Sequence, residues 1–129
     1  MKKIWVNGCF DVLHRGHTEL FKYAKSLGDH LTVGIDTDER VKLAKGNNRP
    51  VNNLEDRKFV LESIKWIDKV VSFGTNSELE AEILANNCEI AVVGGDWKDK
   101  KVVGQHLVNK VIYFERIKGY STTNTLENK

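Results

Sequence analysis

Two histidines three residues apart, His14 and His17, lie in the segment NGCFDVLHRGH at residues 7–17. The segment follows a short apolar run and leads into a stretch with helical periodicity. On a turn that opens a helix, this spacing aims both imidazoles to one side, above free backbone N–H groups and the positive end of the helix dipole. Such donors bind phosphate oxygens and stabilise charge on a phosphoryl group. An ordinary surface loop and a metal pair are the alternatives, and the metal pair lacks a nearby third histidine.

A second candidate anion site lies in ERIKGYSTTN at residues 115–124. Arg116 stands where a strand is expected to end, and Ser121, Thr122 and Thr123 follow a glycine. An arginine beside a hydroxyl-rich helix start forms a second cradle for an anion. Read in isolation, the segment is more typical of a capped C-terminal helix than of an anion site.

The segment VGGDWKDK, residues 93–100, offers a different chemistry. Gly94 and Gly95 permit close approach of the backbone to a flat base. Asp96 supplies a carboxylate and Trp97 a stacking face. A tight turn with a packing tryptophan is the alternative.

Positive charge gathers in VKLAKGNNRPVN, residues 41–52, and just beyond it. The cations are Lys42, Lys45, Arg49 and Arg57. They suit a flap over an anionic substrate, although a solvated charge run is the usual case.

Five short runs rich in β-branched and aromatic residues are predicted to be the strands that position these segments. They are continuous rather than alternating, which is typical of strands covered on both faces. The expected strands span residues 3–7, 31–35, 69–73, 89–93 and 110–114.

Helical periodicity fills the intervals between the expected strands. Gly28 is expected to end the first helix, Asn53 to cap a helix carrying Val60, Ile64 and Ile67 on one face, and a Ser77–Glu80 capping box to open another. Two more helices are expected, one from Thr37 or Asp38 to Ala44 and one from about Lys101 to Val108.

Alternating strands and helices joined by short loops imply βαβ crossovers. The predicted fold class is α/β, a Rossmann-like, doubly wound, parallel five-stranded sheet with helices on both faces. Ligands of such sheets bind at the carboxyl ends of the strands. The segments that directly follow the expected strands are therefore predicted to form the site, and they span residues 7–17, 36–38, 74–77, 94–100 and 115–123.

Composition bounds the function further. The chain has 129 residues and a mass of 14.7 kDa, which fits a single domain over residues 1–129. Its net charge of +2 gives no basic footprint for nucleic acid. Cys9 and Cys88 lack metal-ligand spacing and fit a reducing compartment. Without a signal sequence or a run of about 20 apolar residues, the protein is expected to be cytoplasmic, with no membrane partner.

The segment GCFDVLHRGH resembles the first signature of the nucleotidyltransferase α/β-phosphodiesterase superfamily, which contains the cytidylyltransferases. GYSTT, with Arg116 ahead of it, resembles the second signature, RxxGxSTT. The resemblance spans essentially the whole chain. The HxGH element is shared with class I aminoacyl-tRNA synthetases, but this sequence has no KMSKS-like loop and no room for their other parts.

Two branches of the superfamily compete. KGNNRPVNNLEDR and VVGGDW resemble the adenylyltransferase domains of bifunctional heptose-phosphate enzymes. DTDER, LESIKWIDKV and GGDWKDK are also similar to glycerol-3-phosphate cytidylyltransferases. RPVN and the VVG at residues 102–104 favour the heptose type, and Lys65 stands where the glycerol-phosphate enzymes carry arginine. Val93, however, precedes GGD where the heptose enzymes often have lysine.

The resemblance implies that a phosphorylated sugar or polyol attacks the α-phosphorus of ATP or CTP and displaces pyrophosphate, without a covalent enzyme intermediate. Catalysis would then fall to His14, His17, Lys45 and Arg116. The implied nucleotide-binding residues are Gly8, Cys9, Phe10, Asp11, His14, Gly16, His17, Gly94, Asp96, Arg116, Gly119, Tyr120, Ser121 and Thr122. The implied acceptor-binding residues are Lys45, Arg57, Asp36 and Trp97.

The resemblance also implies a Mg²⁺ ion, oriented or bound by Asp11 and Asp96 directly or through water. It implies a homodimer as well. Alternatives to the heptose 1-phosphate adenylyltransferase are a glycerol-3-phosphate cytidylyltransferase, a nucleotide sensor without turnover, an RNA-linked protein and a subunit of a larger sugar-pathway enzyme.

Overall fold

A parallel sheet forms the centre of the computed structural model, which describes residues 2–94 and 101–114. Its strands are β1 (Lys3–Gly8), β2 (His30–Asp36), β3 (Lys69–Phe73), β4 (Ile90–Gly94) and β5 (Lys110–Phe114). They pair in the order β3-β2-β1-β4-β5, and every pairing is parallel. The predicted five-stranded parallel sheet is therefore confirmed.

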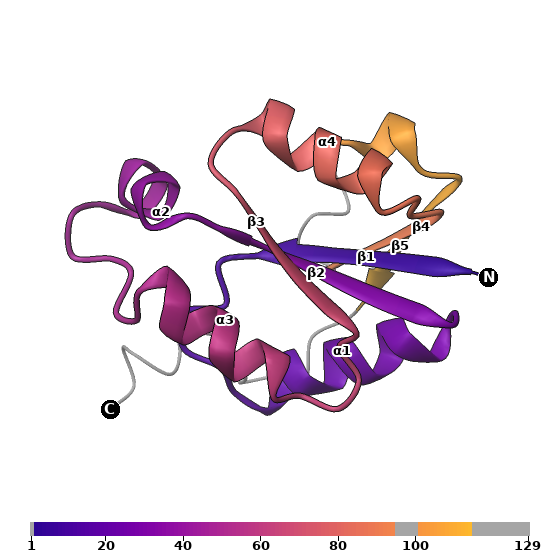
Figure 1. Ribbon diagram of the computed structural model, residues 1–129, viewed down its shortest axis with the longest axis horizontal. Helices are drawn as coiled ribbons and strands as arrows, with labels where there is room; N and C mark the ends of the chain where they lie inside the picture. Colours follow the sequence, from indigo (N-terminus) through magenta and orange to yellow (C-terminus); the bar gives the residue numbers. More distant parts are fainter. Residues whose placement is uncertain (1, 95–100, 115–129) are drawn as a thin grey trace.

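Helices cover both faces of the sheet (Figure 1). They are α1 (Arg15–Ser26), α2 (Asp38–Lys45), α3 (Leu54–Glu62) and α4 (Asn76–Ala85), followed by a 3₁₀ turn, η2 (Gln105–Leu107). α1 and α3 lie on one face, while α4 and η2 lie on the other (Figure 1). The doubly wound α/β arrangement predicted from the sequence is confirmed.

The two faces have separate apolar cores. Within β1, Ile4 and Val6 belong to the core beneath α1 and α3, and Trp5 belongs to the core beneath α4. Gly34 on β2 makes room for Trp5, because a Cβ there would lie 2.6 Å from the indole ring. The strands are continuous apolar runs because alternate side chains enter different cores.

Several helix ends differ from the expected ones. α3 ends at Glu62, so Ile64 and Ile67 follow the helix and Val60 is 48% exposed. α4 begins two residues earlier than the predicted Ser77–Glu80 capping box implies, because Thr75 is the N-cap and its Oγ1 accepts from the backbone N–H of Glu78 at 3.1 Å.

Two glycines mark the ends of other helices. The helix expected over residues 101–108 is reduced to η2, and Gly104 ahead of it has a φ of +82°, which a continuing helix cannot contain. α1 ends at Ser26 with Leu27 as its C-cap, so Gly28 directly follows the cap and the expected end of the helix is confirmed. A Cβ on Gly28 would meet the carbonyl oxygen of Lys2 at 2.6 Å, so glycine is needed there for close packing.

β1 and β4 are neighbours in the sheet, and the connections that follow them run in opposite directions. β1 continues to β2 on one side of the sheet, whereas β4 continues to β5 on the other. A crevice opens at the carboxyl ends of strands where connections diverge in this way. No helix within the described residues is long and apolar enough to cross a membrane.

Candidate active site

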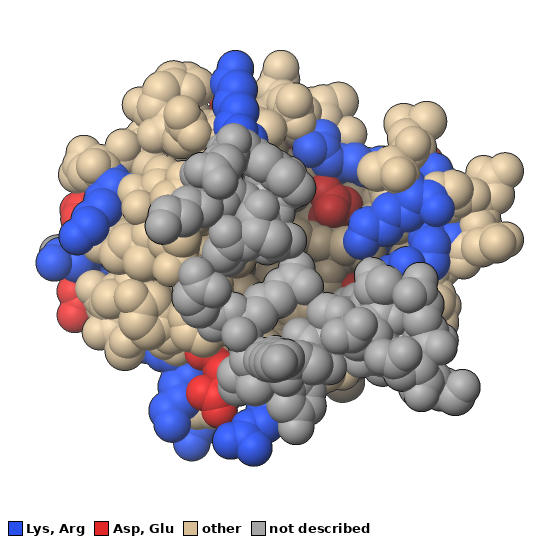
Figure 2. All heavy atoms as spheres, turned by 180° about the vertical axis from the view of Figure 1, so that it is seen from behind, with Lys and Arg blue, Asp and Glu red and all other residues tan. Residues whose placement is uncertain are grey.

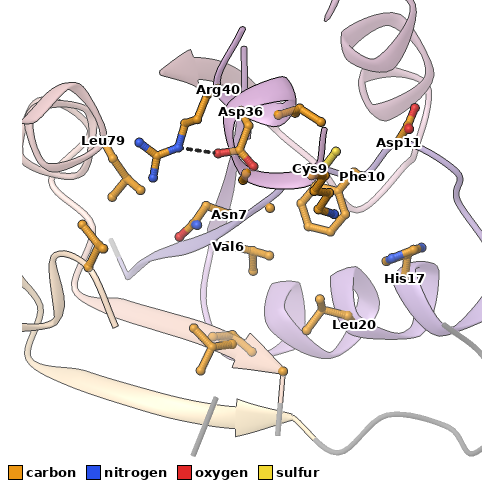
Figure 3. Close-up of a pocket in the computed structure, with 18 of the residues that line it drawn as sticks. Val6, Asn7, Cys9, Phe10, Asp11, His17, Leu20, Asp36, Arg40 and Leu79 are labelled. Carbon is orange, nitrogen blue, oxygen red and sulfur yellow. Dashed lines mark hydrogen bonds and ion pairs between the residues drawn. The ribbon is translucent and has the colours of Figure 1, made fainter. Parts of the chain in front are cut away.

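A cavity of about 480 Å³ lies at the carboxyl ends of the strands (Figure 3). Its walls come from β1 and the loop after it, from the ends of β2 and β4, and from α1 and α2. The predicted site residues that line it are Gly8, Cys9, Phe10, Asp11, His14, Gly16, His17, Asp36, Lys45 and Gly94. The fold thus brings these sequence-predicted residues together.

Seven predicted site residues lie outside the described residues. They are Asp96, Trp97, Arg116, Gly119, Tyr120, Ser121 and Thr122. The predicted C-terminal helix start falls in the same part of the chain. Their roles stay predictions.

His14 and His17 form a capping box that opens α1. His14 Nδ1 accepts from the backbone N–H of Gly16 at 3.0 Å, and His17 Nδ1 accepts from the backbone N–H of His14 at 3.2 Å. The two rings stack with their centroids 4.0 Å apart. Because each Nδ1 accepts a hydrogen bond, the proton of each neutral ring must be on Nε2. The helix start therefore fixes both imidazoles as Nε2–H donors.

Phe10 packs against the ring of His17. It is buried, has a φ of +49°, and meets the His17 ring edge-on with centroids 5.5 Å apart. It also packs edge-on against Phe21 at 5.1 Å. A Cβ on Gly8 would lie 3.0 Å from the Phe10 ring, so glycine there gives the ring its space. Phe10 and Gly8, expected to frame a nucleotide, also position the catalytic candidate His17.

Asp11 ties the loop after β1 to the segment between α2 and α3. Its carboxylate accepts from the backbone N–H groups of Val51 (2.6 Å) and Asn52 (2.7 Å) and from Arg49 Nε (3.1 Å). The carboxyl side chain is 1% exposed. Burial acts to raise the pKa of Asp11, but the hydrogen bonds from Val51, Asn52 and Arg49 outweigh it and lower that pKa.

The predicted metal role of Asp11 does not fit this geometry, because both carboxylate oxygens already accept hydrogen bonds. No group of three or more His, Cys, Asp or Glu side chains suited to a metal occurs among residues 2–94 and 101–114. Asp96, the other predicted Mg²⁺ ligand, lies outside the described residues.

Arg57 was expected to bind substrate, but the structure places it outside the cavity and in the scaffold. Its side chain is fully buried, and its guanidinium donates to the main-chain oxygens of Cys9 (3.0 Å), Asp36 (2.8 Å) and Asn52 (3.0 Å). It also pairs with Asp38 Oδ1 at 2.6 Å. This arginine fastens the ends of β1 and β2 beneath the site.

Asp36 does line the cavity, where it pairs with a residue that the sequence reasoning missed. Arg40, four residues further along the chain, donates from Nε to Asp36 Oδ1 at 2.9 Å (Figure 3). Arg40 also donates to Asn76 Oδ1 at 2.8 Å and lies over the Phe73 ring. The spacing of four between Asp36 and Arg40 was the signal available in the sequence.

Cations dominate the rim next to this pair. Lys45 at the end of α2 and Arg49 beyond it both line the cavity. Lys45 forms no hydrogen bond or ion pair with any of the described side chains. Together with the two imidazole donors, these cations make the cavity suited to phosphate groups.

Cys9 contributes a thiol to the cavity wall. Burial raises the pKa of Cys9, and the charges of Lys45 and Arg57 only partly oppose that effect. The thiol is therefore protonated at neutral pH and is a weak nucleophile.

Comparison with known proteins gives this geometry a family. Residues 5–127 match the family model described as cytidylyltransferase-like. The chain is 40% identical over 127 residues to the bifunctional protein HldE of Helicobacter hepaticus, covering 98% of this chain and 26% of that protein. It is 42% identical over 122 residues to the bifunctional protein HldE of Wolinella succinogenes, covering 95% of this chain and 26% of that protein. The chain thus spans about a quarter of the length of the curated relatives it matches.

Solved structures share the fold. The lipopolysaccharide core biosynthesis protein of Thermoplasma volcanium superposes with a TM-score of 0.73 at 22% identity, over 92% of this chain and 99% of that one. The pantoate–β-alanine ligase of Francisella tularensis superposes with a TM-score of 0.68 at 17% identity, over 99% of this chain and 65% of that one. The family model covers nearly the whole sheet and the paired histidines, and the chain belongs to the cytidylyltransferase-like family of nucleotidyltransferases.

Proposed function

We propose that this domain transfers AMP from ATP to D-glycero-β-D-manno-heptose 1-phosphate and releases pyrophosphate. The support is the 40% identity to bifunctional HldE proteins together with the heptose-type segments KGNNRPVNNLEDR and VVGGDW. The structural observation that carries the proposal is the capping box of His14 and His17, because it fixes two N–H donors on one wall of an anion-suited cavity.

The reaction needs positioning more than acid–base chemistry. The acceptor phosphate is already an anion at neutral pH, so it can attack the α-phosphorus without a general base. A new bond forms between the acceptor oxygen and that phosphorus, while the bond to the bridging oxygen of pyrophosphate breaks. The domain must hold the two groups in line and stabilise the charge that moves onto the leaving group.

His14 and His17 would donate from Nε2 to the α- and β-phosphate oxygens. The fixed tautomer means that neither ring must reorganise when negative charge grows there. Arg116, with Ser121 and Thr122, is proposed to hold the β- and γ-phosphates. Lys45 is proposed to meet the phosphate of the acceptor.

The two substrates are proposed to occupy different sides of the cavity. The nucleotide would lie at the divergence between β1 and β4, where Gly8 and Gly94 allow close approach of the backbone. The acceptor would lie toward the end of β2, where Asp36 lines the cavity and can accept from sugar hydroxyls. Figure 3 shows Asp36 and Arg40 on this side of the cavity, apart from His17 and Leu20.

Magnesium would enter as part of the substrate, as the Mg²⁺ complex of the nucleoside triphosphate. Mg²⁺ in such sites is held mainly by phosphate oxygens and water. A cytoplasmic location fits the need for ATP. The homodimer implied by the family resemblance stays a prediction.

A glycerol-3-phosphate cytidylyltransferase is the second candidate, supported by DTDER and LESIKWIDKV and opposed by Lys65 in place of arginine. An RNA-binding role has less support. On the face seen in Figure 2, Lys and Arg side chains lie in separate groups with acidic side chains between them, not in one continuous basic stripe.

A substrate matrix tests the proposal. Pyrophosphate release is measured for four nucleoside triphosphates, each as its Mg²⁺ complex, against heptose 1-phosphate and glycerol 3-phosphate. We expect ATP with heptose 1-phosphate to exceed every other pair in kcat/KM by about tenfold or more. Preference for CTP with glycerol 3-phosphate would select the second candidate. Nucleotide binding without pyrophosphate release from any pair would indicate a sensor.

A further inference from the structure

Arg49 is the one cation of the cavity wall whose position is fixed by a buried carboxylate among the described residues. It follows α2 after a turn in which its backbone N–H donates to the carbonyl oxygen of Gly46 at 3.2 Å. The turn directs the side chain back to the loop after β1, where Arg49 Nε donates to Asp11 Oδ2 at 3.1 Å. The Arg49 side chain is 20% exposed and lines the cavity.

One terminal nitrogen of the Arg49 guanidinium has no acceptor among the described residues. Arg49 Nη2 is buried, yet it has no hydrogen-bond partner within the described part of the chain. A buried donor that has lost its water and gained no acceptor is costly, so such groups are rare without a ligand or a role. A guanidinium presents its N–H groups as a planar fork, which matches the oxygens of a phosphate.

The Asp11 carboxylate fixes the position of the Arg49 guanidinium. The backbone N–H groups of Val51 and Asn52, just beyond Arg49, donate to the same carboxylate. These bonds anchor the segment at two further points, so the direction of the Arg49 side chain does not depend on the single bond from Nε. The lowered pKa of Asp11 keeps this anchor ionised at neutral pH.

We infer that Arg49, positioned by Asp11, is a second phosphate-binding residue of this cavity and takes the phosphate of the acceptor together with Lys45. Both cations belong to the α2–α3 side of the cavity, beyond the end of β2. The triphosphate is expected at the divergence of β1 and β4 instead. Assigning the phosphate to the acceptor rests on the proposed function, whereas the binding of a phosphate group by Arg49 does not.

The test compares Arg49→Gln with a matched control, Lys58→Gln. The control removes one positive charge from an exposed side chain on α3 that has no place in the cavity. Calorimetric titrations use heptose 1-phosphate and inorganic phosphate as the probes. We expect Arg49→Gln to weaken both dissociation constants by about 10- to 100-fold, as for loss of a hydrogen bond to a charged group. We expect the control to stay near wild type.

Steady-state rates separate the acceptor from the nucleotide. In Arg49→Gln, KM for the acceptor is expected to rise by about 10- to 100-fold, while KM for the triphosphate changes by less than about threefold. Arg49→Lys keeps the charge without the fork, so about a tenfold weakening of acceptor binding is expected. If Arg49→Gln fails to fold, the affinity of Arg49→Lys for the acceptor tests the inference instead.

The outcomes distinguish this inference from the proposed function. If wild-type protein binds the probes through Arg49 but releases no pyrophosphate with heptose 1-phosphate, the proposed function fails and Arg49 remains a phosphate-binding residue. Unchanged probe binding in Arg49→Gln, an equal loss in Lys58→Gln, or no probe binding by wild type would each overturn the inference. A rise in KM for the triphosphate alone would overturn its assignment to the acceptor.

Discussion

Arg57 donates through Nη1 to the main-chain carbonyl oxygen of Asp36, at 2.8 Å, from a fully buried side chain. The same nitrogen donates to the carbonyl oxygen of Cys9 at 3.0 Å, so one guanidinium joins the ends of β1 and β2. Asp38 balances its charge at 2.6 Å. The two strand ends carry cavity residues, and their separation therefore depends on an arginine that does not enter the cavity.

Replacing Arg57 with leucine is expected to lower the free energy of unfolding by about 3–5 kcal/mol, because three main-chain oxygens and Asp38 lose their partner. Urea denaturation measures the change. The adjacent exposed substitution Lys58→Gln should stay within about 0.5 kcal/mol of wild type. If Arg57→Leu lost less than about 1 kcal/mol of unfolding free energy, the Arg57 guanidinium would not be what holds the ends of β1 and β2 together.

The sequence was sufficient for the sheet, because buried parallel strands are continuous apolar runs that no other element imitates at this length. It was also sufficient for the paired histidines, whose spacing is local. The sequence was insufficient for Arg57. An arginine in a charged segment can bind either a substrate or main-chain carbonyls, and the sequence does not distinguish the two roles. Three of the four partners of Arg57 are 19 to 48 residues away in the chain, and only the fold brings them together.

Asp11 is a second residue whose role the sequence alone could not predict. A carboxylate after the first strand suggests a metal ligand, but its oxygens accept from Val51 and Asn52, about forty residues further on. Helix ends were also hard to place, because Thr75 and Ser77 are both good N-caps and the structure uses Thr75.

His17 can be tested by a pair of substitutions that separate capping from catalysis. Glutamine at the third helical position can accept from the backbone N–H of residue 14, as His17 does, whereas alanine cannot. We expect both His17→Gln and His17→Ala to lower kcat by about 10²–10³, because both lose the imidazole donor. Only His17→Ala should lose about 1 kcal/mol of stability. Turnover near wild type in His17→Gln would remove the imidazole from the mechanism.

The Asp11 anchor should leave a signature in the pH dependence of stability. The pKa of Asp11 is lower in the folded state than the value of about 3.9 expected when unfolded. Its stabilising contribution is therefore complete above pH 4 and is lost as the pH falls through the folded pKa. Asp11→Asn is expected to be about 1–3 kcal/mol less stable than wild type at pH 7, because asparagine cannot serve all three donors.

Chemical denaturation between pH 2 and pH 7 measures this effect. The difference between wild type and Asp11→Asn should shrink as the pH falls below about 4. Glu62→Gln, an exposed change at the end of α3, serves as the control and should follow wild type at every pH. Parallel curves for wild type and Asp11→Asn would show that Asp11 titrates as it does in the unfolded chain.

The two thiols should differ in their alkylation. Burial raises the pKa of Cys9, and it raises the pKa of Cys88 to about 11. Since the thiolate is the reactive form, we expect iodoacetamide to modify both slowly at pH 7. Above about pH 9, Cys9 should react first, because it lines the cavity while Cys88 is enclosed beneath α4.

Mass spectrometry of the modified peptides follows the two sites separately, with Cys9→Ser confirming the assignment. A saturating nucleoside triphosphate should slow modification of Cys9 by about tenfold or more, since a bound ligand covers the wall on which the thiol lies. Cys88 should react only after unfolding and should gain no direct protection. If the nucleotide left Cys9 exposed to the reagent, the triphosphate could not occupy the cavity beside His14 and His17, because the same loop carries all three side chains.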